Sequence, residues 1–179
     1  MLLGISGSLR KEATNRKLIR EAARLYGGPY TEADLRLPLY DGDEEKAEGI
    51  PAKVQTLADQ IKAAEAVVIS TPEYNQLLSG VLKNALDWVS RVPGRPWRDK
   101  PVAVISAADG RAGGARANSS LRLALVPFRP RMLMGPDVMV ADSSNAFDES
   151  GRLTGERYIA QLTELMELLK AEARRGQGA

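Results

Sequence analysis

The sequence predicts an α/β fold in which helices cover both faces of a parallel β-sheet. The chain has 179 residues, a length that suits one domain with a substantial core. Short apolar runs alternate along it with longer segments in which apolar residues recur at helical spacing. Strands that are joined by helices lie parallel, and the connecting helices pack on the two faces of the sheet.

Five apolar runs are the predicted strands. The first, third and fourth are almost wholly apolar, as expected for strands that are buried on both faces. The fifth is interrupted at Gly135-Pro136, because proline cannot donate a hydrogen bond to a neighbouring strand. The predicted strands span residues 2–6, 30–35, 67–70, 102–106 and 132–140.

Five further segments have the periodicity of amphipathic helices. In the first of them, Leu18, Ile19 and Ala22 fall on one face. The acidic stretch 41–48 lacks such a face and is interpreted as a solvated loop. The predicted helices span residues 15–26, 54–64, 81–89, 115–125 and 156–173.

The composition narrows the possible partners. The 25 basic and 23 acidic side chains are interspersed and give a net charge of +2, which argues against nucleic acid. No apolar run reaches the length of about 18 residues that a membrane span needs, and the first residues do not resemble a signal peptide. We therefore expect a cytoplasmic protein, with residues 1–175 forming a single domain and residues 176–179 a disordered tail.

The chain contains neither cysteine nor histidine. The first absence excludes disulfides, thiolate nucleophiles and cysteine-based zinc sites. The second removes the commonest general base and the commonest transition-metal ligand. We therefore predict no metal site and expect a bound cofactor, rather than a catalytic side chain, to carry the chemistry.

The loop after the third strand has an unusual content. Pro72, Glu73, Tyr74 and Asn75 supply a proline, a carboxylate, an aromatic ring and an amide in four consecutive positions. An ordinary connection needs only residues that favour turns. Open α/β sheets bind ligands at the carboxyl ends of their strands, so this loop is a predicted binding surface.

The loop after the first strand offers groups that bind anions. Ser8 and Thr14 carry hydroxyls, Arg10 carries a guanidinium, and backbone amides enter a helix that begins near Asn15. The start of a helix binds phosphate through unpaired amides and the positive end of the helix dipole. An equally acceptable interpretation makes Thr14 or Asn15 the helix cap and leaves Arg10 in solvent.

The loop after the fourth strand is rich in glycine. It runs from Ser106 through Gly110 to Gly113 and Gly114. Glycines let backbone amides approach a flat ring or an anion closely. Taken alone, the pattern favours a flexible connection to the next helix. If the strand order is 2-1-3-4-5, however, the loops after the first and third strands converge where the order reverses.

Together these segments resemble the NADPH-dependent FMN reductase family, and within it most closely the bacterial chromate and quinone reductases. The resemblance extends from the first strand to about the fifth. Its most specific part is the proline-containing loop with the helix that follows it. The matching segments are Ser8-Leu9-Arg10 with Asn15, Leu37-Pro38-Leu39-Tyr40-Asp41, Pro72-Glu73-Tyr74-Asn75, Gly80-Val81-Leu82-Lys83-Asn84-Ala85-Leu86-Asp87-Trp88 and Gly113-Gly114-Ala115-Arg116-Ala117.

The resemblance implies a flavodoxin-like fold, a three-layer sandwich with a five-stranded parallel sheet of order 2-1-3-4-5, and a non-covalent FMN. It implies that the isoalloxazine ring lies against the loop after the third strand, with the loop after the fourth on its pyrimidine side. The residues implied in cofactor binding are Ser8, Leu9, Arg10, Thr14 and Asn15 for the phosphate, and Pro72, Glu73, Tyr74, Asn75, Ser106 and Gly110 for the ring.

Three positions depart from the family pattern, and a fourth places a negative charge near the expected phosphate. Ala13 stands where relatives often carry a serine, which removes one phosphate-binding hydroxyl. Leu77 and Ser79 replace a serine and a proline, which alters the pocket above the flavin or a subunit contact. Glu12 brings a negative charge near the phosphate, so it must point outward or be neutralised.

The implied activity is transfer of hydride from NADPH or NADH through FMN to quinones by a ping-pong mechanism. Related acceptors are chromate, azo compounds, free flavin and ferric complexes. The alternatives are a non-enzymatic flavodoxin-type electron carrier and an FMN-binding module. A carrier usually has a strongly acidic docking surface, which a chain of net charge +2 lacks. Glu73 is interpreted as structural rather than as a base.

The resemblance also implies a homodimer or homotetramer. The helix at residues 81–89 is the expected contact, because it carries more apolar residues than one core face needs. No membrane and no nucleic acid are expected among the partners.

Overall fold

Strands β1 (Leu2–Ser6), β3 (Ala66–Thr71) and β4 (Pro101–Ala107) form the centre of a parallel sheet in this computed structural model, which describes residues 1–175. The sheet order is β2-β1-β3-β4-β5, with β2 (Tyr30–Glu32) at one edge. The predicted strand order is thereby confirmed. The predicted second strand is too long, because pairing stops at Glu32.

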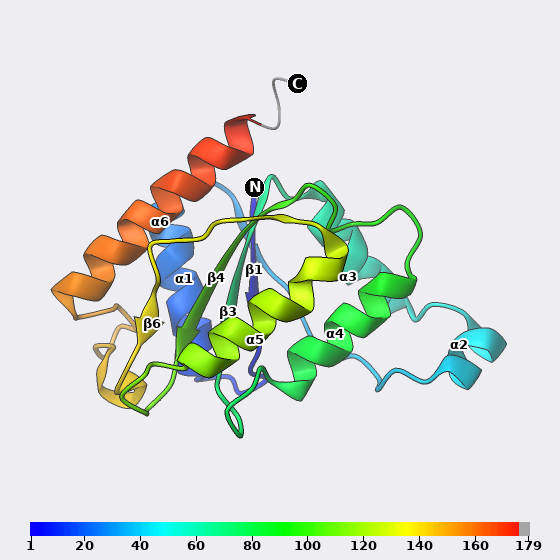
Figure 1. Ribbon diagram of the computed structural model, residues 1–179, viewed down its shortest axis with the longest axis horizontal. Helices are drawn as coiled ribbons and strands as arrows, with labels where there is room; N and C mark the ends of the chain where they lie inside the picture. The colour runs from blue at the N-terminus through cyan, green and yellow to red at the C-terminus, as the bar shows by residue number, and fades with distance from the viewer. Residues whose placement is uncertain (176–179) are drawn as a thin grey trace.

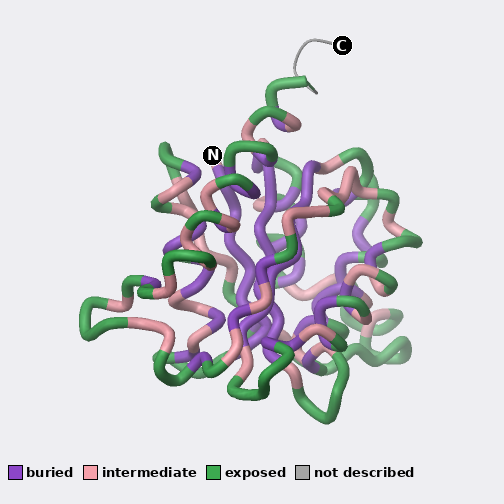
Figure 2. Tube along the Cα trace, turned by 60° about the vertical axis from the view of Figure 1, so that its left-hand side comes forward, coloured by how far each residue is buried: buried purple, intermediate pink, exposed green. Residues whose placement is uncertain are grey.

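Alternation of side chains along the central strands builds two separate cores. Leu3 and Ile5 point into one core, whereas Leu2 belongs to the other. All residues of β1, β3 and β4 are buried, which explains why their sequences are continuously apolar. Figure 2 shows these buried strands running through the middle of the molecule, with exposed backbone at the periphery.

Helices cover the two faces unequally. Helices α1 (Thr14–Tyr26) and α6 (Glu156–Arg175) pack side by side on one face (Figure 1). The other face is covered by α3 (Ala52–Ala63), α4 (Gly80–Arg91) and α5 (Ala115–Leu125). The result is the predicted three-layer arrangement.

The predicted fifth strand is divided into two short pieces. Residues Arg131–Met132 form β5, which pairs with the start of β4, and Met139–Val140 form β6, which pairs with its end. The chain leaves the sheet between them and passes through a cis Gly135–Pro136 bond. A proline cannot complete the ladder, so one continuous strand over residues 132–140 does not form.

The acidic stretch is a helix and not a loop. Helix α2 (Gly42–Glu48) has no buried residue and extends away from the body of the molecule beyond α4 (Figure 1). Asp41 caps it by accepting a hydrogen bond from the Asp43 amide at 2.8 Å. The acidic first turn complements the helix dipole. The stretch is solvated as predicted, but a local cap and charge pattern make it helical.

Two 3₁₀ turns complete the described chain, at Val126–Phe128 (η1) and Ser143–Asn145 (η2). No helix within residues 1–175 is both long enough and apolar enough to cross a membrane. The predicted tail, residues 176–179, lies outside the described residues. The assignment of residues 1–175 to a single domain stays a prediction.

Candidate functional site

Three loops meet at the carboxyl ends of β1, β3 and β4, at the lower edge of Figure 1. We call residues 7–13 the first loop, residues 72–79 the second loop and residues 108–114 the third loop. The first two are in direct contact, because a Cβ atom on Gly7 would lie 2.8 Å from Cδ of Pro72. The hydroxyl of Ser79 also donates to the carbonyl of Gly7 at 2.7 Å. The parallel sheet therefore brings the sequence-predicted segments together.

The first loop enters α1 without a side-chain cap. The N-cap residue is Ala13, so the interpretation in which Thr14 or Asn15 caps the helix is wrong. Within the described chain, no acceptor pairs with the backbone amides of Thr14 and Asn15. Unpaired first-turn amides and the positive end of the helix dipole make this an anion-binding position.

Side chains of the first loop add to this positive potential. Arg10 and Leu9 are exposed, and Arg10 forms no ion pair with any residue in 1–175. Ser8 is buried, and its hydroxyl oxygen accepts a hydrogen bond from the Arg10 amide at 3.4 Å, which leaves the hydroxyl proton available. Glu12 is exposed and lines a separate cleft together with Lys17.

Asn15 connects α1 to the sheet. Its side-chain nitrogen donates to the carbonyl of Ala107 at 2.9 Å. Its side-chain oxygen accepts from the Ser70 hydroxyl at 2.7 Å and from the Ala107 amide at 3.1 Å. The side chain is buried, so it contributes to the site by fixing the first turn of α1 against β3 and β4. Only its backbone amide is free for a ligand.

The sequence reasoning missed a polar network beside the first loop. Thr14 donates its hydroxyl to Ser143 at 3.2 Å, and Ser143 donates to Asp109 at 3.0 Å. The amide and hydroxyl of Ser144 donate to the same carboxylate oxygen at 2.9 and 2.7 Å. These bonds, aided by the charge of Arg10, lower the pKa of Asp109 below its ordinary value. No local pattern identifies the network, because each of its bonds joins residues that are 34 or more positions apart.

The second loop is a tight hairpin. Tyr74 and Leu77 exchange two backbone hydrogen bonds, of 3.3 and 3.2 Å between nitrogen and oxygen. Between them Asn75 and Gln76 both have positive φ, 51° and 69°, as in a type I′ turn. The Tyr74 ring is half exposed and is thereby presented at the edge of the sheet.

Glu73 anchors this hairpin to α5. One carboxylate oxygen accepts hydrogen bonds from the amides of Arg116 and Ala117, at 3.0 and 3.1 Å. The N-cap of α5 is Gly114, which has no side chain to do this. Glu73 therefore caps a helix that lies more than 40 residues away, which supports a structural role rather than one as a general base.

The third loop is closed by β4 and β6. Ser106 is fully buried, and its hydroxyl donates to the carbonyl of Gly113 at 2.7 Å. A Cβ atom on Gly113 would lie 2.4 Å from the carbonyl oxygen of Met139, so only glycine allows this approach. Gly110 faces open space. Ser106 thus shapes the loop, and Gly110 stands at its accessible tip.

The positions that depart from the family pattern have different consequences. Ser79 is the N-cap of α4, because its hydroxyl oxygen accepts from the Leu82 amide at 3.3 Å. Leu77 is exposed on the hairpin, beside a cleft of about 610 Å³ that Arg116 and Leu123 also line. Ala13 is buried, so a hydroxyl is simply missing there. Of these three substitutions, only Leu77 changes an accessible surface.

The apolar residues of α4 are used within the chain. Leu82, Leu86 and Val89 are each no more than 3% exposed, because they pack against the sheet and α3. The prediction that α4 carries more apolar side chains than the core needs is therefore wrong, and these side chains do not support a subunit contact. Exposed apolar side chains include Leu123 on α5 and Val126 directly after it.

The fold and the three loops define a flavodoxin-like protein with an anion-binding position at the carboxyl edge of its sheet. Residues 1–145 match the family described as NADPH-dependent FMN reductase, and the chain belongs to this family. This confirms the predicted fold, an oxidoreductase activity that uses NAD(P)H, and FMN as the cofactor.

Individual relatives agree with this assignment. The chain is 41% identical over 180 residues to the NAD(P)H-dependent FMN reductase PA1204 of Pseudomonas aeruginosa, covering 99% of this chain and 97% of the relative. It is 38% identical over 162 residues to a quinone reductase of Escherichia coli K12, covering 88% and 86%. Among solved structures, the flavoenzyme NAD(P)H:(acceptor) oxidoreductase FerB from Paracoccus denitrificans superposes with a TM-score of 0.87 at 30% identity, covering 97% of both chains.

Proposed function

We propose that the protein is a quinone reductase that uses NADPH or NADH as its electron donor. The observation that carries this proposal is its likeness to quinone reductases along most of their length. The chain has no histidine or cysteine, so the reaction relies on the cofactor and on positioning. When bound, FMN would supply the two-electron redox chemistry between the nicotinamide and the acceptor.

The first loop holds the phosphate in this proposal. The donors are the amides of Thr14 and Asn15, the hydroxyl of Ser8, the backbone of Leu9 and the guanidinium of Arg10, whereas the Thr14 hydroxyl donates to Ser143. The residues fit a phosphate because the two amides lack acceptors in the described chain and Arg10 lacks an ion-pair partner there. Arginine adds charge-assisted bonds to phosphate oxygens. Because the Thr14 hydroxyl donates to Ser143, it does not replace the hydroxyl that is missing at Ala13.

The second and third loops hold the ring. Tyr74 provides an exposed aromatic surface beside the buried Pro72, and Asn75 provides backbone polar groups in a turn of fixed geometry. Glu73 keeps this surface in place through its bonds to α5. On the other side, Ser106 shapes the loop whose tip is Gly110. Pre-positioned backbone amides of this tip stabilise negative charge as it develops during the reaction.

The donor and the acceptor use the same exposed face in turn, which is the physical basis for ping-pong kinetics. The hairpin cleft beside Leu77 is open, so it selects weakly among flat acceptors. Quinones are the principal class proposed. Chromate, azo compounds, free flavin and ferric complexes are further acceptors that an open face admits.

We also propose that the protein forms a homodimer or homotetramer. The exposed Leu123, which lines the same cleft as the hairpin residue Leu77, and the exposed Val126 provide apolar surface for such a contact. Sedimentation velocity over a range of concentrations tests this: dimers or tetramers are expected, and a concentration-independent monomer would contradict it.

Anaerobic rapid mixing tests the proposed function. The purified protein with FMN is mixed with NADPH or with NADH, and the flavin absorbance is followed. Fast bleaching, followed by recovery when a quinone is added, is the expected result. Absence of bleaching with either nucleotide would reject the reductase and favour a flavodoxin-type carrier or an FMN-binding module.

A further inference from the structure

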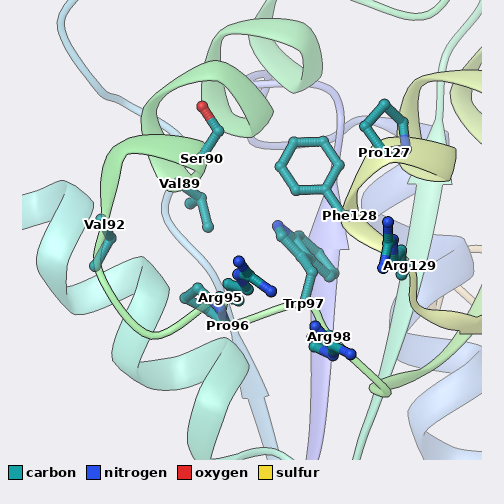
Figure 3. Close-up of a pocket in the computed structure, with 10 residues that line it drawn as sticks. All are labelled: Val89, Ser90, Val92, Arg95, Pro96, Trp97, Arg98, Pro127, Phe128 and Arg129. Atoms are coloured by element: carbon teal, nitrogen blue, oxygen red, sulfur yellow. The ribbon is translucent and has the colours of Figure 1, made fainter.

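A basic cleft lies at the opposite edge of the sheet from the three loops. It has a volume of about 570 Å³ and is formed where α4 and η1 end and where the chain enters β4. Figure 3 shows the rings of Trp97 and Phe128 in its centre, with Arg95 on one side and Arg129 on the other. We call this the amino-edge cleft.

Two of the three arginines that line the amino-edge cleft are unpaired in the described chain. In the described part of the chain, neither Arg95 nor Arg129 has a side-chain hydrogen bond or an ion pair. The third, Arg98, forms an ion pair of 3.6 Å with the carboxylate of Asp99, which is largely exposed. The neighbouring Lys100 is turned away, since its ammonium donates to the carbonyls of Lys62 and Ala64.

The floor of the amino-edge cleft is apolar and aromatic. Trp97 is 3% exposed, and Phe128 packs against the core cluster that contains it. The indole nitrogen of Trp97 is buried without an acceptor among residues 1–175. In Figure 3 this nitrogen is directed toward the gap between Val89 and Phe128. A buried donor without a partner is uncommon and marks a position where a ligand oxygen is favoured.

The walls of the amino-edge cleft are held in an unusual backbone conformation. Arg95, Asp99 and Arg129 all have positive φ, at 49°, 58° and 56°. The Asp99 amide donates to the Arg129 carbonyl at 3.1 Å, and the Arg98 amide donates to the Arg95 carbonyl at 3.0 Å. Left-handed conformations are disfavoured for arginine and persist only where the surrounding structure enforces them. The arginines are therefore presented from a pre-formed frame.

We propose that the amino-edge cleft binds a small aromatic anion, a carboxylate or sulfonate, at a site separate from the flavin-facing edge. The aromatic body packs against Trp97 and Phe128, whose ring faces and edges favour such contacts. The anionic group lies between Arg95 and Arg129, whose guanidinium groups form charge-assisted bonds with planar oxyanions. Both the aromatic floor and the arginines are needed for selectivity. The floor binds any apolar ring, and the arginines favour a ring that carries a negative charge.

Calorimetry and NMR with naphthalene-1-sulfonate as the probe test the proposal on the FMN-saturated protein. Saturable binding is expected, with the indole N–H signal of Trp97 shifting along the same curve. The signal of Trp88 should stay in place, because its indole nitrogen donates to the carbonyl of Pro38 at 2.8 Å. A Trp97→Phe variant assigns the two signals.

Matched variants separate the cleft from general charge. Arg95→Gln with Arg129→Gln is expected to raise the dissociation constant at least about tenfold, because charge-assisted contacts are lost. Arg157→Gln with Arg174→Gln removes the same charge from exposed positions on α6 and should leave binding within about twofold. Uncharged naphthalene-1-methanol should bind at least about tenfold more weakly than the sulfonate. The proposal is overturned by equal losses in both double variants, by release of FMN on binding, or by an unmoved Trp97 signal.

Discussion

The first and second loops lie in contact at the same edge of the sheet, yet they use their polar groups in opposite ways. The first loop leaves the amides of Thr14 and Asn15 without acceptors in the described chain. In the second loop the backbone groups of Tyr74 and Leu77 bond to each other, and the carboxylate of Glu73 accepts hydrogen bonds from α5. One loop is thus free to bind charge, and the other is a rigid surface. Together they provide the two things that a phosphorylated planar cofactor needs.

The first prediction concerns the residue that fixes the start of α1 against β3 and β4. Asn15→Ala leaves the carbonyl and amide of Ala107 and the hydroxyl of Ser70 without partners in a buried place. Unsatisfied buried groups cost roughly 1–3 kcal/mol each, so the free energy of unfolding should fall by about 3 kcal/mol. Urea denaturation measures this. Asn145→Ala, an exposed asparagine, is the control and should cost less than about 0.5 kcal/mol. A loss for Asn15→Ala as small as that of the control would contradict the account.

The second prediction tests the binding role of the first loop. Arg10→Ala should weaken FMN binding by about 2 kcal/mol, or roughly 30-fold, because hydrogen bonds to charged groups contribute about that much. Titration of the apoprotein with FMN, followed by flavin fluorescence, gives the dissociation constant. Lys11→Ala removes the adjacent exposed charge and should change it less than about threefold. Equal FMN affinity in both variants would mean that the phosphate is held elsewhere.

The third prediction tests the rigidity of the second loop. Glu73→Ala removes the cap of α5 and should lower the free energy of unfolding by about 1 kcal/mol. Hydrogen exchange should also increase at the amides of Arg116 and Ala117. Glu12→Ala, which removes an exposed carboxylate, is the control. If Glu73 acts as a base instead, its removal leaves stability unchanged and alters the pH profile of flavin reduction.

The smallest expected effect concerns the network that joins the first and third loops. The bonds from Ser144 and Ser143 hold the pKa of Asp109 below its ordinary value. A lowered pKa in the folded state contributes stability above the unfolded pKa of about 4, and this is lost as the pH falls through the folded value. Asp109 is exposed, so the contribution is less than about 1 kcal/mol.

Thermal denaturation between about pH 2 and 7 detects this contribution. Asp109→Asn should flatten the acid limb of the stability curve, whereas Asp59→Asn on the exposed surface of α3 should not. If the acid limb is the same in wild type and Asp109→Asn, the bonds to Asp109 do not contribute to stability.

The sequence was most informative where structure is local. Apolar runs predict the central strands, and helical spacing predicts the five main helices, because both depend on neighbouring residues. Helix α2 escaped this reasoning because a cap at Asp41 and a charged first turn, not an apolar face, stabilise it. The division of the fifth strand follows from how β4 accommodates two short partners, although the Gly135-Pro136 interruption is visible in the sequence.

Within the site, residue types were predictable and their partners were not. The sequence alone does not distinguish whether Asn15 caps helix α1 or bonds this helix to the sheet. Its actual partners, Ser70 and Ala107, lie 55 and 92 positions away. The same holds for Glu73, whose carboxylate was recognised as structural but whose target on α5 only the fold reveals. Long-range pairing is decided by topology, not by local pattern.

A crystal structure of the protein with FMN bound is the most direct test of the contrast between the two loops. The account predicts that phosphate oxygens accept hydrogen bonds from the amides of Thr14 and Asn15 and from Arg10, with the ring resting on Pro72 and Tyr74. It also predicts that the second loop keeps its hairpin geometry. A phosphate bound at any other position, such as the amino-edge cleft, would contradict the central claim.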